Sequence, residues 1–143
     1  MKHYMVNQMS AFIDTGVFVA ARNKRDINHE KAVNLLREAL KGKYGRIYTS
    51  DYIFDEAVTV ALVRTRKPDI AIDIGNFILS SKKLRILHVD KLVFMDAWRI
   101  FKKYVNKKLS FTDAVSIALM RRYNIDYIMS FDKHFDNIVP RIS

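Results

Sequence analysis

The 143-residue sequence predicts an α/β fold, a three-layer α/β/α sandwich around a central, mostly parallel sheet of four to five strands. Two observations favour this class. Short apolar runs of strand length alternate along the chain with segments whose apolar residues have helical spacing. The runs are apolar on both faces, which is typical of parallel strands that helices cover on either side.

Five segments have the length and apolar composition of buried strands. They occupy residues 10–14 (SAFID), 46–50 (RIYTS), 84–89 (LRILHV), 125–130 (IDYIMS) and, as a short last strand, 137–139 (NIV). Helical segments separate most of them, so these strands are joined by crossovers and point the same way. Their carboxyl ends are therefore expected to meet at one edge of the sheet.

Helix signals fill the intervals between the strands. Thr15 opens a helix directly after the first strand, and Asp90 is a good N-cap for a later one. Pro68 disfavours helical backbone at the residue before it and fits the first turn of the next helix. The predicted helices start at Thr15 and then span residues 27–42, 51–67, 68–81, 90–105 and 112–124.

Composition narrows the class of protein further. The chain has no cysteine, which excludes disulfides, zinc–thiolate sites and thiol nucleophiles. No apolar run approaches the roughly 18 residues of a membrane span, and the start lacks the apolar core of a signal peptide. We expect a single domain over residues 1–143, cytoplasmic and without membrane attachment, with residues 1–8 as a flexible N-terminal extension.

The charge balance points to a polyanionic partner. There are 25 basic and 15 acidic residues, which gives a net charge of +10. Nucleic acid is the simplest partner for such a chain, although a solvated surface of Lys and Arg explains the same excess.

Four acidic residues fall where the predicted fold places functional groups. Asp14 ends the first strand, and Asp132 lies just after the fourth. Glu56 lies in the helix after the second strand, and Asp113 lies in the first turn of the helix before the fourth. Because sites in open α/β sheets form beyond the carboxyl ends of the strands, one edge can gather all four side chains.

Each acid also has an ordinary structural explanation. Asp14 can cap a helix, Asp113 can form a capping box with Ser110, Asp132 can make an Asx turn, and Glu56 can face solvent. These structural explanations fit the four acids less well when they are considered together, since most of them are flanked by apolar residues that must be buried. Clustered carboxylates raise one another's pKa, and a bound cation relieves their repulsion.

The donor set indicates the chemistry of such a site. Oxygen ligands without cysteine or a histidine cluster favour Mg²⁺ or Mn²⁺. Hard cations on a basic protein suggest phosphodiester hydrolysis, in which two ions about 4 Å apart activate water and stabilise the leaving oxygen. Two alternatives stay open: a non-catalytic RNA-binding or protein-interaction module, and a nuclease acting on DNA or in rRNA or tRNA processing.

Four segments together resemble the PIN-domain nucleases. They are FIDTGVFVA (12–20), DEAVTVAL (55–62), LSFTDAVSIALMRR (109–122) and IDYIMSFDKHFD (125–136). The resemblance covers about residues 10–140, and small single-domain members of this type resemble VapC-like toxins of type II toxin–antitoxin systems. It implies a ribonuclease that depends on Mg²⁺ or Mn²⁺, with Asp14, Glu56, Asp113 and Asp132 as its catalytic, metal-binding acids.

The resemblance also implies supporting residues. Thr15 and Thr112 match hydroxyl positions beside the first and third acids; Thr15 is expected to act through a metal-bound water, and Thr112 as polar support or as a cap. Asp136 is a candidate fifth metal ligand unless it only faces solvent. Ser130 stands where the family often has threonine.

The resemblance further implies three partners: an RNA substrate, a cognate antitoxin whose tail enters the site, and a second copy of the chain in a homodimer. Two other residues are expected to have no role in the site. His134, a lone histidine in a loop, is expected at the surface rather than in catalysis, and Trp98 is expected to pack in the core.

Overall fold

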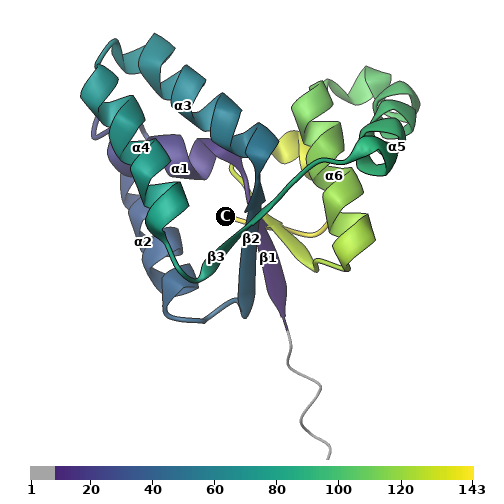
Figure 1. The fold of residues 1–143 in the computed structure, drawn as a ribbon, viewed down its shortest axis with the longest axis horizontal. Helices are drawn as coiled ribbons and strands as arrows, with labels where there is room; N and C mark the ends of the chain where they lie inside the picture. The colour runs from purple at the N-terminus through teal and green to yellow at the C-terminus, as the bar shows by residue number, and fades with distance from the viewer. Residues whose placement is uncertain (1–8) are drawn as a thin grey trace, which may run out of the picture.

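The structure is a computed structural model and describes residues 9–143. The extension expected at residues 1–8 lies outside this range. Within it, five strands form one parallel sheet in the order β3-β2-β1-β4-β5 (Figure 1). The strands are β1 (Ser10–Ile13), β2 (Arg46–Ser50), β3 (Leu84–Leu87), β4 (Tyr127–Met129) and β5 (Arg141–Ile142). The predicted α/β class and parallel sheet are confirmed.

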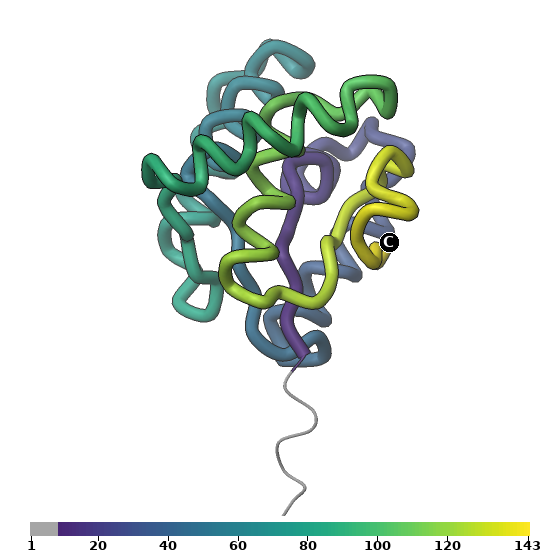
Figure 2. Tube along the Cα trace, turned by 90° about the vertical axis from the view of Figure 1, so that its right-hand side faces the viewer, coloured from purple at the N-terminus to yellow at the C-terminus, as the bar shows by residue number. Residues whose placement is uncertain are grey.

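Helices cover both faces of the sheet. One layer holds α1 (Thr15–Arg22), α2 (His29–Leu40), α3 (Asp51–Thr65) and α4 (Pro68–Ser80) (Figure 1). The other layer holds α5 (Lys91–Lys103) and α6 (Phe111–Tyr123), which pack against each other in Figure 2. Short 3-10 turns, η2 (Val105–Lys107) and η3 (Lys133–Phe135), follow α5 and β4. Among the described helices, none is long and apolar enough to cross a membrane.

The sheet changes its winding direction at β1. This strand pairs with β2 on one side and with β4 on the other. The chain reaches β2 through α1 and α2, whereas it reaches β4 through α5 and α6 on the opposite face (Figure 1). Crossovers that diverge to opposite faces leave a crevice at the carboxyl end of the strand between them. The residues that follow β1 and β4 therefore meet at this switch point.

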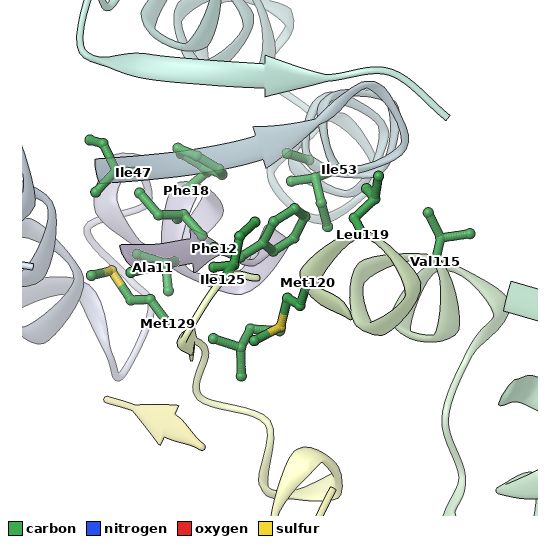
Figure 3. Packing of buried hydrophobic residues seen from close by; sticks show 14 of the residues in the cluster. Ala11, Phe12, Phe18, Ile47, Ile53, Val115, Leu119, Met120, Ile125 and Met129 are labelled. Atoms are coloured by element: carbon green, nitrogen blue, oxygen red, sulfur yellow. The ribbon is translucent and has the colours of Figure 1, made fainter. Parts of the chain in front are cut away.

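The core anchors α6 firmly behind this point. Every residue of α6 from Asp113 to Met120 is buried, and all of them except Asp113 and Ser116 are apolar. In Figure 3 the ring of Phe12 from β1 lies between Ile53 of α3 and Met120 of α6. Each large side chain buried in this way stabilises the fold by about 1.5–3 kcal/mol.

One close approach of the backbone requires glycine. Gly45 precedes β2 with a φ of +73°, and a Cβ built there would lie 1.9 Å from the carbonyl oxygen of Met9. The next residue, Arg46, donates its N–H to the same oxygen at 3.2 Å. The glycine thus allows β1 and β2 to begin side by side.

The last strand does not lie where the sequence predicts it. Residues 137–139 form a turn instead: Asn137 has a φ of 69°, and the N–H groups of Ile138 and Val139 both donate to the carbonyl of Phe135. The strand pairing with β4 begins two residues later, at Arg141. The left-handed Asn137 and the three-residue turn explain why an apolar run alone misplaces this strand.

The expectation for Trp98 is also wrong. Its side chain lies on the outer face of α5, where the residue is 44% exposed. It stacks on Phe101, with ring centroids 5.8 Å apart, and Lys102 lies over its ring.

Candidate active site

The predicted acids line one hollow at the switch point. This hollow of about 510 Å³ is lined by Asp14, Glu56, Asp113 and Asp132, together with Thr15. Ser110, Ser130 and His134 also line it, as do the basic side chains of Arg64 and Lys108. Thr112 and Asp136 are not part of this lining. Carboxylates separated by up to 118 positions in the sequence thus share one pocket, as parallel topology requires.

Asp14 is the most deeply placed of the acids. Its N–H donates to the carbonyl of Met129 at 3.0 Å, which extends the pairing of β1 with β4 by one residue. Asp14 holds the cap position of α1, but its side chain makes no capping bond. Its Oδ2 instead accepts a hydrogen bond of 2.7 Å from the hydroxyl of Ser130. The simple helix-cap explanation therefore fails for this residue.

Burial dominates the protonation of Asp14. The residue is 6% exposed, and loss of water around the carboxyl raises its pKa to about 7. The nearby carboxylates of Asp113 and Glu56 push the pKa in the same direction, while the hydrogen bond from Ser130 opposes them. With a pKa of about 7, both the protonated and the ionised form of this carboxyl are populated near neutral pH.

Asp113 has both a structural and an electrostatic role. Its N–H donates to Ser110 Oγ at 3.0 Å, and its Oδ2 accepts from the Ser110 N–H at 2.9 Å, which completes a capping box. Burial raises the pKa of Asp113, and the charges of Asp132 and Glu56 add to the rise. The expected cap is present, and it holds the carboxylate at the positive end of α6.

Glu56 is tied to the start of α1. It lies in the second turn of α3, half-buried, and its Oε1 accepts a hydrogen bond from the hydroxyl of Thr15. This contact joins two helices that begin at neighbouring strands. Glu56 therefore faces the hollow and its neighbours rather than only solvent.

Asp132 makes the Asx turn that its loop position suggests. Its Oδ1 accepts from the N–H of His134 at 2.8 Å, and the same oxygen lies 2.9 Å from His134 Nδ1. The N–H of Asp132 donates to Ser130 Oγ at 3.0 Å. His134 is partly exposed, as expected, and its ring borders the hollow.

Sequence reasoning misses the contacts that Ser130 and Arg141 make around the hollow. Arg141 donates from Nη1 to the carbonyl of Ser130 at 3.1 Å and from Nε to Asp136 Oδ1 at 2.8 Å. The hydrogen bond from Arg141 holds the pKa of Asp136 below its usual range. Asp136 thus pairs with Arg141 outside the hollow, which supports its alternative interpretation as a solvent-facing residue. The signal for Ser130 was its place two residues before Asp132.

Comparison with known proteins assigns the class of this molecule. The sequence matches the PIN-domain family over residues 11–139, so the chain belongs to that family. It is similar to a VapC ribonuclease of Archaeoglobus fulgidus, with 31% identity over 128 residues that cover 89% of this chain and 80% of the relative.

A second relative extends this similarity to three dimensions. The 23S rRNA-specific endonuclease VapC20 of Mycobacterium tuberculosis is 29% identical over 124 residues, which cover 87% of this chain and 90% of the relative. The crystal structure of VapC20, described as a sarcin-ricin loop cleaving toxin, matches with a TM-score of 0.75 and 28% identity over 85% of this chain and 89% of that one. The predicted resemblance to PIN-domain proteins of the VapC type is confirmed.

Proposed function

We propose that this chain is an endoribonuclease that hydrolyses RNA phosphodiester bonds and acts as the toxin of a toxin–antitoxin pair. The observation that supports this function most directly is the shared hollow of Asp14, Glu56, Asp113 and Asp132 in a chain of net charge +10. The names of the VapC relatives, a ribonuclease and a 23S rRNA-specific endonuclease, support the same activity.

The proposed cofactor is Mg²⁺ or Mn²⁺, held by these four acids. As they stand, each carboxylate accepts a bond from a protein donor, and within residues 9–143 no three Asp, Glu or His side chains converge tightly enough to hold an ion. The donor chemistry nevertheless fits, because all the groups are hard oxygens and the pKa values of Asp14 and Asp113 are raised in part by neighbouring carboxylates. A bound cation supplies charge that activates water and stabilises the leaving oxygen.

The protein's own residues position the acids for this work. Ser130 orients Asp14, the capping box orients Asp113, and Thr15 orients Glu56. Binding a divalent cation requires Asp14 to lose its proton, which its pKa of about 7 allows near neutral pH. Arg64 and Lys108 border the same hollow, where they can neutralise the phosphate of a bound strand.

The test compares RNA cleavage by the parent chain, Asp14→Asn and Asp113→Asn in Mg²⁺ or Mn²⁺. Removing one of two central carboxylates should reduce cleavage by at least about a hundredfold. Asp136→Asn is the matched control, since it removes a carboxylate outside the hollow. Calorimetric titration should show that Mn²⁺ binds more weakly to Asp14→Asn and Asp113→Asn, but not to Asp136→Asn.

Two outcomes would change the proposal. Equal cleavage by the parent and the Asp14 and Asp113 variants would remove these acids from the site. RNA binding that EDTA leaves unchanged, without cleavage under any metal condition, would favour a non-catalytic RNA-binding module.

The proposed partners are RNA, a cognate antitoxin and a second copy of the chain. The toxin description of VapC20 supports the antitoxin, and the PIN family membership supports the homodimer as an expectation. A small neighbouring reading frame whose product inhibits cleavage on co-expression would support the antitoxin. Light scattering of the purified chain measures the mass, and a mass of one chain at all concentrations would contradict the homodimer.

A further inference from the structure

A second hollow lies beside the acidic one and has the opposite charge. Its volume is about 500 Å³, and five of its eight lining residues are Arg or Lys, while none is acidic. The basic residues are Arg22, Lys24, Arg25, Arg64 and Lys67. Arg64 lines both hollows, so the basic hollow lies next to the acidic one.

Two helices connect the hollows. α1 begins at Thr15 in the acidic hollow and ends at Arg22 in the basic one. On α3, Glu56, Val60 and Arg64 follow one another at intervals of four, so they share a face of the helix. Eight residues of helix correspond to about 12 Å along the axis. The basic hollow therefore lies a short, fixed distance from the acids.

Local structure accounts for only part of this basic charge. Arg22 and Arg64 lie in the last turns of α1 and α3, where cations stabilise the helix dipole, and Arg22 also pairs with Asp73 at 3.3 Å. Lys24, Arg25 and Lys67 lie beyond the helix ends and are exposed. Within residues 9–143, no carboxylate lies within ion-pair distance of these three side chains. Positive charge gathered in a groove raises the local concentration of anions.

We propose that this basic hollow is a binding subsite for the backbone of single-stranded RNA, which it holds a few nucleotides from the bond cleaved in the acidic hollow. The inference rests on the proposed ribonuclease function. An RNA strand is favoured over an acidic peptide because Arg64 borders both this hollow and the hollow that a substrate phosphate must enter. Lys and Arg that contact phosphates fix the position of a strand without reading its bases.

This subsite makes a specific demand on the substrate. A strand long enough to reach both hollows gains the additional phosphate contacts, whereas a trinucleotide in the acidic hollow does not. The subsite therefore contributes to affinity for long RNA, in a salt-dependent manner, and leaves the chemical step unchanged.

The experiment uses the double variant Arg25→Gln and Lys67→Gln, which removes two charges from the basic hollow and leaves Arg64 in place. The matched control is Lys82→Gln and Lys83→Gln, an exposed basic pair in the turn before β3, which lines a separate hollow with Arg46 and Arg85 and neither of these two. Each protein is assayed on a long single-stranded RNA of mixed sequence and on a trinucleotide.

The basic-hollow variant should raise KM for the long RNA by about tenfold with kcat unchanged, and leave trinucleotide cleavage as in the parent. The slope of log affinity against log salt concentration should become shallower by about 1.4, because two phosphate contacts are lost and each contributes about 0.7 to the slope on single strands. The control pair should change none of these quantities.

Direct binding separates this inference from the proposed activity. Fluorescence anisotropy of labelled RNA, measured in EDTA on an Asp14→Asn background, reports binding whether or not the parent cleaves. Weaker binding on loss of Arg25 and Lys67 supports the subsite even if no cleavage is found. If the parent cleaves RNA and the basic-hollow variant binds RNA as tightly as the control variant does, the proposed subsite is rejected. The same holds if Arg25 and Lys67 affect only the binding of an acidic protein partner.

Discussion

The hydroxyl of Ser130 donates a hydrogen bond of 2.7 Å to Oδ2 of Asp14. The hydroxyl oxygen of Ser130 also accepts a hydrogen bond from the N–H of Asp132 at 3.0 Å, so one small side chain lies between two of the acids in the hollow. A hydroxyl can make both bonds because it carries one donor and two acceptor positions. Ser130 therefore sets the orientation of Asp14 and the direction in which the chain leaves β4.

Replacing Ser130 tests this positioning role. Ser130→Ala should reduce cleavage by about 10–100-fold, the usual effect of removing a residue that orients a metal ligand. Because the lost hydrogen bond lowers the pKa of Asp14, the acidic limb of the pH–rate profile should move to higher pH. Ser130→Thr keeps the hydroxyl and should retain both the rate and the profile. A profile that stays in place in Ser130→Ala would argue for a merely structural role.

Asp14 should make the metal-free fold less stable as the pH rises. The unfolded carboxyl ionises near pKa 3.8, whereas burial raises the folded value to about 7. Between these values the folded state keeps a proton that the unfolded state has lost, so the free energy of unfolding falls with rising pH. Asp14→Asn removes this loss and should raise the free energy of unfolding at about pH 8 by about 2–4 kcal/mol, with little change near pH 4.

Urea titrations in EDTA at the two pH values measure this difference. Asp136→Asn is the control for the loss of an acidic residue, because Asp136 is exposed and paired with Arg141. If Asp14→Asn changed the free energy of unfolding equally at both pH values, the result would contradict the conclusion that burial disfavours the ionised form of Asp14.

Divalent cations should stabilise the folded chain more strongly at alkaline than at acidic pH. Protons compete with the cation for Asp14 and Asp113, whose pKa values are both raised, so binding strengthens as the pH passes through 7. Thermal melting with saturating Mn²⁺ should therefore show a larger rise in Tm near pH 8 than near pH 5. An equal rise at both values would place the bound ion elsewhere.

The pair of Arg141 and Asp136 should act on stability rather than on metal binding. Arg141→Ala removes hydrogen bonds to Asp136 and to the carbonyl of Ser130, which should lower the free energy of unfolding modestly, because solvent screens the exposed pair with Asp136. Asp136→Asn should leave Mn²⁺ affinity unchanged. If Asp136→Asn lowered the affinity for Mn²⁺ as much as Asp132→Asn does, Asp136 would be a metal ligand after all.

The two threonines predicted as supporting residues should differ in importance. Thr15 donates to Glu56, so Thr15→Val should free that carboxylate and reduce cleavage by about tenfold or more. Thr112 lies outside the hollow, and Ser110 is the cap of α6, so Thr112→Val should stay within about twofold of the parent. Paired cleavage assays on the two variants make this comparison, and equal losses would contradict it.

The convergence of the acids was predictable because each lies at a definite position near the end of a strand or the start of a helix. Asp14 ends β1, Asp132 follows β4, and both strands point the same way. Parallel topology turns these separate offsets into one location. The capping box of Asp113 was equally accessible, since it depends on residues three apart in the sequence.

The remaining features depend on contacts between distant segments that leave no local pattern. The bonds of Ser130 to Asp14 and of Arg141 to Ser130 follow from how β4, β5 and β1 pack. The position of Arg64 at the border of both hollows depends on α1 packing beside α3. Apolar composition also misleads at the surface, as Trp98 shows: it gives no sign of which face of α5 lies outward.

The sheet order has a consequence for the synthesis of this nuclease. β1 is made first, but its neighbour β4 brings Ser130, which follows Asp14 by 116 residues. Until β4 has left the ribosome, one edge of β1 stays unpaired and Asp14 lacks the hydroxyl that orients it. The acidic centre is thus completed only after Ser130 and Asp132 have been made, so a chain that stops short of them carries no assembled site beside the RNA of the ribosome that is making it.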